Sequence, residues 1–130
     1  MAQAPTAISL QREARQLELR YADGSTLEIP VELLRVYSPS AEVRGHGSGE
    51  RRLQTGKKYV GITDIEAVGN YAIRITFDDG HDTGLYTWAL LEDLGRNQAR
   101  YFADYERELA SANASRLPTI PLGRWTPPKD

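Results

Sequence analysis

One stretch in the middle of the chain constrains the fold more than any other, because two strand-like runs lie on either side of a turn signal. Between residues 71 and 77, apolar Tyr, Ile, Ile and Phe alternate with Ala, Arg and Thr, which is the period of a strand with one face against the core. Asp79-Gly80 then favours a tight hairpin turn, because glycine adopts the positive φ angle that such turns require. Residues 84–88 would form the returning strand. The stretch therefore predicts an antiparallel β-hairpin.

Similar patterns predict regular structure along most of the remaining chain. Asp23-Gly24 is a second hairpin signal, and Pro39 disfavours helical geometry at the residue before it. Thr87 and Gly95 are expected to cap the two ends of a helix. The expected elements are strands at 8–10, 16–21, 26–29 and 60–68, with a bulge near Asp64, and helices at 31–36, 88–94 and 97–112.

The last of these helices carries an aromatic stripe. Tyr101, Phe102, Tyr105 and Leu109 recur at a spacing of three to four residues, which is typical of a helix face that packs on a core. Core packing is therefore favoured over a ligand-binding role for these aromatic side chains.

Together the elements predict a single α+β domain: a mixed, largely antiparallel sheet built from β-hairpins, with a short helix after Pro30 and two C-terminal helices. A chain of 130 residues is long enough for one core of its own. The expected organisation is a flexible N-terminus at 1–7, a domain at 8–96, a C-terminal helix at 97–113 and a Pro-rich tail at 114–130. Trp125 lies in this tail, and an ordered Trp125 would have to dock on another surface.

The composition excludes several classes of site. The chain contains no Cys, so it forms no disulfide and offers no thiolate metal ligand or Cys nucleophile. It contains no run of about 18 apolar residues and no secretory signal pattern, so we expect a cytoplasmic protein without membrane contact. Its net charge of -2 argues against a nucleic-acid binder that works by bulk charge, although a local basic patch would still allow one.

Residues 38–58 form a Gly-rich segment without apolar periodicity, which predicts a long loop. Its excess positive charge could contact an anion or a protein partner through arginine forks and glycine N–H groups. The alternative is a loop that faces water, in which case replacing Arg44, Arg51 or Arg52 with Ala would leave folding nearly intact. The candidate contact residues are Arg44, Arg51, Arg52, Lys57 and Lys58.

Three segments of the chain together resemble a known family. They are LLRVYSPS at 33–40, VGITDIEAVGNYAIRITFDDGH at 60–81 and LYTWALLEDLG at 85–95, and in this order they are similar to the gamma-butyrobetaine hydroxylase-like N-terminal domain family, long labelled as a domain of unknown function. In that family the domain occurs as a small stand-alone bacterial protein, as the N-terminal part of iron- and 2-oxoglutarate-dependent oxygenases of carnitine biosynthesis, and fused to ATPases of Fe–S cluster assembly. The resemblance implies a largely antiparallel sheet with helices at one side.

The resemblance also implies a zinc site that this sequence does not retain. In the oxygenase members, three Cys in a Cys-Pro-Cys-x-x-Cys arrangement and one His after an Asp-Gly pair hold a structural zinc. The matching positions here are Ser38, Ser40, Val43 and His81, and hydroxyls and a valine do not replace thiolates at neutral pH. The chain is therefore expected to be of the stand-alone bacterial type that lacks the zinc-ligand cysteines.

A second hypothesis places a different metal site in the same region. His81, Asp82 and His46 offer nitrogen and oxygen ligands for a divalent metal such as iron or zinc, with Asp78 and Asp79 nearby. This site requires the long loop to fold over the hairpin. The alternative is that His81 caps the turn or forms hydrogen bonds within the hairpin.

The sequence shows no catalytic constellation. Ser38 and Ser40 lack an elbow motif and a recognisable base, and the His-x-Asp pattern of the oxygenase facial triad is absent. The balance is therefore against an enzyme and favours a non-catalytic interaction or adaptor module, which the resemblance associates with a metallocofactor (Fe–S) assembly or oxygenase partner. The alternatives are a metal-binding protein and an anion or nucleic-acid binder that uses loop residues 44–58.

Overall fold

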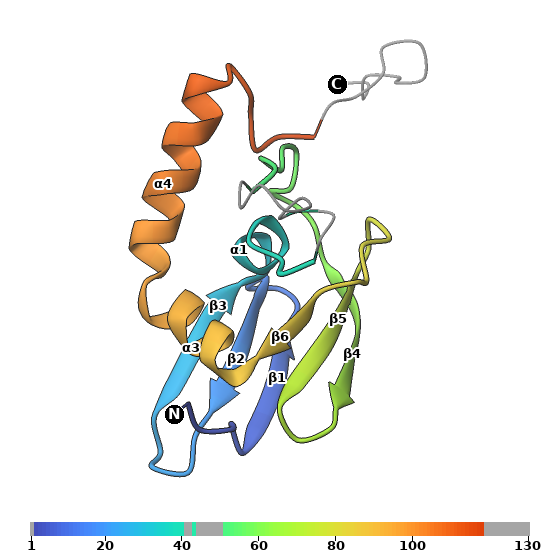
Figure 1. The fold of residues 1–130 in the computed structure, drawn as a ribbon, viewed down its shortest axis with the longest axis vertical. Coiled ribbons are helices and arrows are strands. Elements are labelled where there is room, and N and C mark those ends of the chain that lie inside the picture. The colour runs from blue at the N-terminus through green and yellow to red at the C-terminus, as the bar shows by residue number, and fades with distance from the viewer. Residues whose placement is uncertain (1, 41–42, 44–50, 119–130) are drawn as a thin grey trace.

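The computed structural model describes residues 2–40, 43 and 51–118, and within them it contains six strands and three helices (Figure 1). Arg44, His46 and Trp125 lie outside the described residues. The chain forms one small α+β domain, so the predicted fold class is confirmed. The described strands form two three-stranded sheets, and each pairing within them is antiparallel.

The N-terminal part of the chain forms the first sheet, in the order β1 (Ala7–Gln11), β2 (Gln16–Arg20) and β3 (Thr26–Pro30). The predicted turn joins β2 to β3: Gly24 has a φ angle of +88°, and the Asp23 carboxylate accepts a hydrogen bond of 2.9 Å from the Ser25 N–H. Leu17 and Leu19 on β2 are fully buried, as a period of two predicts for one face of a strand.

The second sheet follows the long loop, in the order β4 (Ile62–Val68), β5 (Ala72–Phe77) and β6 (Leu85–Thr87). The register of β4 against β5 shifts between Ile62 and Asp64, which confirms the predicted bulge. Tyr71 does not belong to the buried face that the alternation predicted, because it is 53% exposed. The physical reason is that β5 begins at Ala72, so Tyr71 remains in the preceding turn, where its N–H bonds to the Val68 carbonyl.

The helices of the described chain are α1 (Val31–Val36), α3 (Trp88–Arg96) and α4 (Gln98–Ser111). In Figure 1, α1 lies at one end of the two sheets, and α4 runs along one side of the molecule and extends past that end. Thr87 caps α3 as predicted, because its hydroxyl accepts a hydrogen bond of 3.2 Å from the Leu90 N–H. No helix in the described part of the chain is long and apolar enough to cross a membrane.

Gly95 does not cap the end of α3, so that prediction is wrong. It lies inside the helix, which continues to Arg96 and is capped by Asn97, and it is buried. A Cβ atom at this position would lie 3.1 Å from Leu27 Cδ1 and 3.3 Å from Ile29 Cγ1. The missing side chain therefore lets α3 approach β3 closely.

One hydrophobic core lies between the two sheets, α1 and α3, and this shared core makes them a single domain. A smaller cluster of Val36, Tyr105 and Leu109 joins α1 to α4, which confirms the packing role predicted for the aromatic stripe. The largest fully buried side chains of the main core include Leu17, Leu19, Ile29, Leu33, Leu34, Ile75, Phe77, Tyr86, Leu91 and Leu94.

The segment after α4 returns to the domain. Arg116 forms a two-point ion pair with the buried Glu32 of α1, with N–O distances of 2.8 and 2.6 Å, and the Tyr105 hydroxyl donates to the same carboxylate at 3.0 Å. Main-chain hydrogen bonds also join residues 56–58 to residues 115–116. The beginning of the predicted Pro-rich tail is therefore docked on α1 and on the long loop.

Replacing Arg116 with Ala is expected to lower the free energy of unfolding by about 2 kcal/mol, because Glu32 would stay buried without its cation. Arg107→Ala is the matched control, since Arg107 pairs with Asp104 on an exposed part of α4 and such pairs contribute less than about 1 kcal/mol. Chemical denaturation of both variants measures the difference. Equal losses would show that Glu32 does not depend on Arg116.

Candidate functional site

The residues that the sequence singles out meet where the end of α1 faces the loop between β5 and β6. Ser38 Oγ lies 2.8 Å from His81 Nε2, and Ser40 Oγ lies 2.5 Å from the Thr83 hydroxyl. The Ser40 N–H also donates to Ser38 Oγ at 3.3 Å. We refer to Ser38, Ser40, His81 and Thr83 as the His81 cluster. It joins two segments that lie 43 residues apart in the sequence.

Two residues near β6 explain why these segments approach so closely. The Tyr86 hydroxyl donates a hydrogen bond of 2.6 Å to the Leu34 carbonyl, which ties β6 to α1. Burial raises the pKa of the Tyr86 phenol, so the hydroxyl keeps its proton for this bond. A Cβ atom on Gly84 would lie only 2.6 Å from Ser38 Oγ. Glycine at this position therefore makes room for the His81 cluster.

The Asp79-Gly80 turn forms as a tight turn, as predicted. Gly80 has a φ angle of +90°, its N–H donates to the Phe77 carbonyl at 3.0 Å, and the Phe77 N–H donates to the His81 carbonyl at 2.9 Å. The regular pairing of β5 with β6 is short, because it joins only Ala72–Arg74 to Leu85–Thr87. Between the turn and β6, Thr83 and Gly84 lie against Ser40 and Ser38.

Asp79 is the centre of a charge network in this loop. Its Oδ2 atom accepts hydrogen bonds from Arg35 Nε at 2.8 Å and from Lys57 Nζ at 2.6 Å, and its Oδ1 atom accepts one from the main-chain N–H of His81 at 3.1 Å. Burial alone would raise the pKa of Asp79, but the three donors lower it to about 2. The charged carboxylate therefore ties α1, the long loop and the hairpin turn together at neutral pH.

The Ser38–His81 pair has the two groups of a nucleophile and its base, but it is placed inside the protein. Ser38 is 1% exposed and His81 is 6% exposed. Nucleophilic catalysis requires the reacting carbon of a substrate to reach the serine oxygen. The pair is therefore not accessible to a substrate in this arrangement, and its contacts are those of a packed, hydrogen-bonded junction.

The four positions at which the family resemblance places zinc ligands do come together. Ser38, Ser40, Val43 and His81 are all buried, and the Val43 N–H bonds to the Ser40 carbonyl at 3.0 Å. Their side chains offer one imidazole, two hydroxyls and an alkyl group, whereas a structural zinc site takes four N, S or O ligands that are mostly thiolates and imidazoles. These residues therefore do not fit a structural zinc ion.

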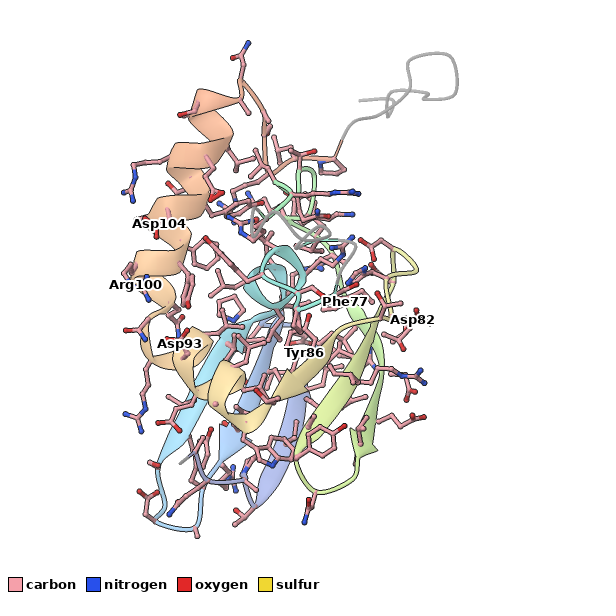
Figure 2. The ribbon with its side chains drawn as sticks, in the orientation of Figure 1. Phe77, Asp82, Tyr86, Asp93, Arg100 and Asp104 are labelled. Carbon is pink, nitrogen blue, oxygen red and sulfur yellow. The ribbon has the colours of Figure 1, made fainter. Side chains whose placement is uncertain are left out.

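The alternative metal site gains no support from the part of the chain that the structure describes. Within that part, no group of three or more His, Asp or Glu side chains is arranged to hold a metal ion. His81 is buried against Ser38, whereas Asp82 is exposed at the outer side of the loop (Figure 2). A site that combines His81 with His46 stays a prediction, because His46 lies outside the described residues.

Arg51 does not belong to a loop that simply faces water, so that alternative is wrong for this residue. Its guanidinium lies 4.2 Å from the centre of the Tyr37 ring and pairs with Glu108 of α4. The Arg51 side chain is only 19% exposed. These contacts give it a packing role between the loop and the helices.

The other predicted contact residues of the loop are divided among separate environments. Lys57 belongs to the Asp79 network, and Lys58 lies against an aromatic ring. Arg52 is exposed, and Arg44 lies outside the described residues. Arg51, Lys57 and Lys58 are thus held by separate partners, and the role of the loop cations as anion contacts stays a prediction.

Sequence reasoning missed two features of this site. It rejected Ser38 for lack of a base, although His81 is its partner, and it assigned no role to Arg35. A signal existed for the first feature: the resemblance aligns Ser38 and His81 with ligands of one metal ion, and such ligands must lie close together. No local signal pairs Arg35 with Asp79, because the two residues are 44 positions apart.

The fold and the site define a class of protein: a small α+β domain in which hydrogen-bonded side chains fill the junction between a short helix and a hairpin loop. A family model described as gamma-butyrobetaine hydroxylase-like, N-terminal, matches residues 8–92. The chain belongs to this family.

The solved structures that are similar to this chain include three described here. Two of them are solution NMR structures. The first is 44% identical to this chain, the match covers 96% of this chain and 98% of the other, and the TM-score is 0.78. The second is 49% identical, the match covers 92% of this chain and 89% of the other, and the TM-score is 0.77. The third is a crystal structure of a protein of unknown function of the DUF971 family from Acidithiobacillus ferrooxidans, which is 35% identical, covers 71% and 92%, and has a TM-score of 0.59. No match is found among curated proteins.

Gly84→Ala is expected to lower the free energy of unfolding by about 2 kcal/mol, because the added Cβ would overlap Ser38 Oγ. Ser38→Ala removes this oxygen, so the glycine substitution is expected to be about 1 kcal/mol less damaging in a Ser38→Ala background. Chemical denaturation of the two single variants and the double variant measures this coupling. Additive losses would mean that Gly84 is needed for a reason other than its approach to Ser38.

The stabilisation by Asp79 is expected to disappear in acid. The folded-state pKa of about 2 lies below the unfolded value of about 3.9, so the contribution is complete above about pH 5 and is lost as the pH falls from about 4 towards 2. Asp79 is partly exposed, so its expected size is about 1 kcal/mol. Denaturation of wild-type and Asp79→Asn protein across this range measures the contribution.

Asp82→Asn is the matched control for this measurement, because Asp82 is an exposed carboxylate on the same loop. Its variant is expected to follow the wild-type pH dependence. A stability difference between wild type and Asp79→Asn that stays constant with pH would contradict a role for the Asp79 charge.

Proposed function

We propose that this domain is a non-catalytic interaction module that binds a protein partner through a surface groove beside α4. The α4 groove lies between this helix and the loop segment that begins at Arg51. The residues that line it include Tyr37, Arg51, Leu53, Tyr101, Glu108 and Ser111.

The observation that carries the proposal is a preformed group of aromatic and arginine side chains in this groove. The rings of Tyr37 and Tyr101 meet edge to face with their centroids 4.7 Å apart, and the Arg51 guanidinium lies 4.2 Å from the centre of the Tyr37 ring. Tyr and Arg are among the residue types that contribute most to protein interfaces. Side chains that are already ordered lose less conformational freedom on binding, which supports this surface as a docking site.

The charges of the groove favour an apolar partner segment. Arg51 pairs with Glu108, and Arg107 pairs with Asp104, so each of these cations has a carboxylate of the same chain beside it. A phosphate would have to displace these carboxylates, whereas apolar side chains of a partner would only cover Leu53 and the aromatic rings. The arrangement therefore supports a protein partner over the anion or nucleic-acid alternative.

The family resemblance suggests which kind of protein the partner is. The resemblance associates such domains with oxygenases and with ATPases of Fe–S cluster assembly, so we expect a metallocofactor-assembly or oxygenase partner in the cytoplasm. The metal-binding alternative stays a prediction, because no observation on the described residues favours it.

A photo-reactive amino acid placed at Leu53 is expected to crosslink the domain to one protein in cells of its source organism, which mass spectrometry would identify. Ser111→Arg adds a long charged side chain to the groove and is expected to reduce the crosslinked product at least about tenfold. Ala103→Arg is the matched control, because it adds the same charge to an exposed position of α4 that does not line the groove. Its crosslinked product is expected to equal that of the unaltered domain.

Salt distinguishes the proposed partner from a nucleic acid. Crosslinking in lysate is expected to persist from about 50 to 200 mM salt, because apolar contacts release no counterions, whereas phosphate contacts weaken steeply over this range. Equal capture of the same protein by a probe at Glu66, on an exposed part of β4, would contradict the α4 groove as the binding surface.

A further inference from the structure

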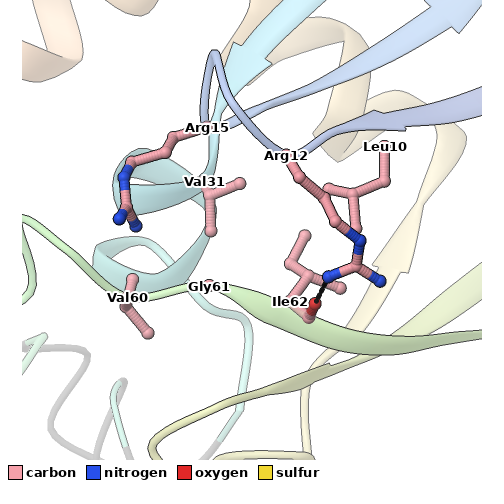
Figure 3. A pocket seen from close by; sticks show the side chains of 7 residues that line it. All are labelled: Leu10, Arg12, Arg15, Val31, Val60, Gly61 and Ile62. Atoms are coloured by element: carbon pink, nitrogen blue, oxygen red, sulfur yellow. Dashed lines mark hydrogen bonds between the residues drawn. The ribbon is translucent and has the colours of Figure 1, made fainter.

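A cavity of about 160 Å³ lies between the turn that joins β1 to β2 and the chain that enters β4 (Figure 3). Four aliphatic side chains, those of Leu10, Val31, Val60 and Ile62, form one part of its wall, and polar atoms form the other part. Val31, Val60 and Ile62 belong to the main hydrophobic core. The cavity is therefore a small space with an aliphatic part that opens at the surface, and it shares no lining residue with the His81 cluster or the α4 groove.

Two arginines of the turn flank this cavity on opposite sides (Figure 3). Arg12 Nη1 donates a hydrogen bond of 3.3 Å to the Ile62 carbonyl, and Arg15 Nη1 donates one of 2.8 Å to the Tyr59 carbonyl. The Arg15 carbonyl in turn accepts a hydrogen bond of 3.0 Å from the Val31 N–H, which fixes the turn to α1. The main chain across the cavity therefore holds both guanidinium groups in place.

Neither guanidinium pairs with a carboxylate of the described residues within 4.0 Å. Most other described arginines do form such pairs, for example Arg35, Arg51 and Arg116. A guanidinium has five N–H donors, and each of these two uses one in a hydrogen bond to a carbonyl. Both arginines are exposed, so two positive charges and most of their donors are open to solvent beside the cavity.

We propose that this cavity binds a carboxylate carried by a small apolar group, with the carboxylate at Arg12 or Arg15 and the apolar group against the aliphatic part of the wall. Guanidinium groups bind carboxylates through paired, charge-assisted hydrogen bonds. A core cavity of about 150 Å³ admits a benzene ring, so an apolar group of roughly four to six carbon atoms fits the space. The ligand is a short-chain acid or the C-terminal residue of a chain that ends in Val or Leu.

The lining distinguishes this site from one for inorganic phosphate. Phosphate has no apolar part, so it would leave Leu10, Val31 and Val60 uncovered and would gain only the contacts to the two arginines. Burial of aliphatic surface instead adds a favourable free energy in proportion to the area that a ligand covers. The cavity therefore favours an acid with an apolar tail over a compact anion.

The test is a titration of isotope-labelled protein with butyrate, followed by NMR through the amide signals of Gly61 and Ile62. Butyrate is expected to shift these signals to saturation, and its neutral isostere butyramide is expected to bind at least about tenfold more weakly. A short peptide that ends in Val separates the two sources. Tighter binding of its free acid than of butyrate assigns a chain terminus, and binding of butyrate alone assigns a small acid.

The double variant Arg12→Gln/Arg15→Gln is expected to bind butyrate at least about tenfold more weakly than the wild type. Arg20→Gln is the matched control, because Arg20 is an exposed arginine of the same sheet that does not line the cavity; its affinity is expected to be unchanged. If the double variant loses its dispersed spectrum, Arg12→Gln alone is measured against the same criterion. Equal binding of butyramide or phosphate, an unchanged affinity in the variant, or no saturable shift with butyrate or the peptide would overturn the proposal.

Discussion

The structure depends on the neutralisation of two charges in helix α1. This helix is only six residues long and all of its residues are buried, including Glu32 and Arg35. A buried charge is strongly unfavourable unless a partner compensates it. Neither residue finds that partner nearby in the sequence: Glu32 pairs with Arg116, and Arg35 pairs with Asp79. The burial of α1 therefore requires the two long-range ion pairs.

These two pairs determine the path of distant segments. Arg116 brings the chain after α4 back to α1, and Asp79 holds the loop between β5 and β6 against the end of the same helix. Once the loop is held there, His81 meets Ser38, and the absence of a side chain at Gly84 permits the contact. The His81 cluster is thus a geometric consequence of how the charges of α1 are compensated.

The parts of the fold that depend on neighbouring residues follow from the sequence, and the parts that depend on distant contacts do not. A break in alternation locates the bulge near Asp64, and Thr87 caps α3, because both signals are local. Glycine is common at the ends of helices. Gly95 nevertheless lies inside α3, because β3 approaches the helix closely there, and no local sequence pattern indicates that contact. At the site, the family resemblance predicts that Ser38 and His81 lie close together. The ion pairs of α1 could not be predicted from the sequence, because their partners are distant along the chain.

The His81 cluster also bears on which kind of function this domain can have. A structural zinc contributes directly to folding, and the positions that the resemblance assigns to its ligands join α1 to the hairpin loop. Here the same junction relies on hydrogen bonds of about 1 kcal/mol each and on the Asp79 network. The junction therefore forms with residues that cannot supply thiolates. A function that uses the shape of the surface around α1, such as contact with a protein, is compatible with this chemistry, whereas one that needs a thiolate-bound metal at these positions is not.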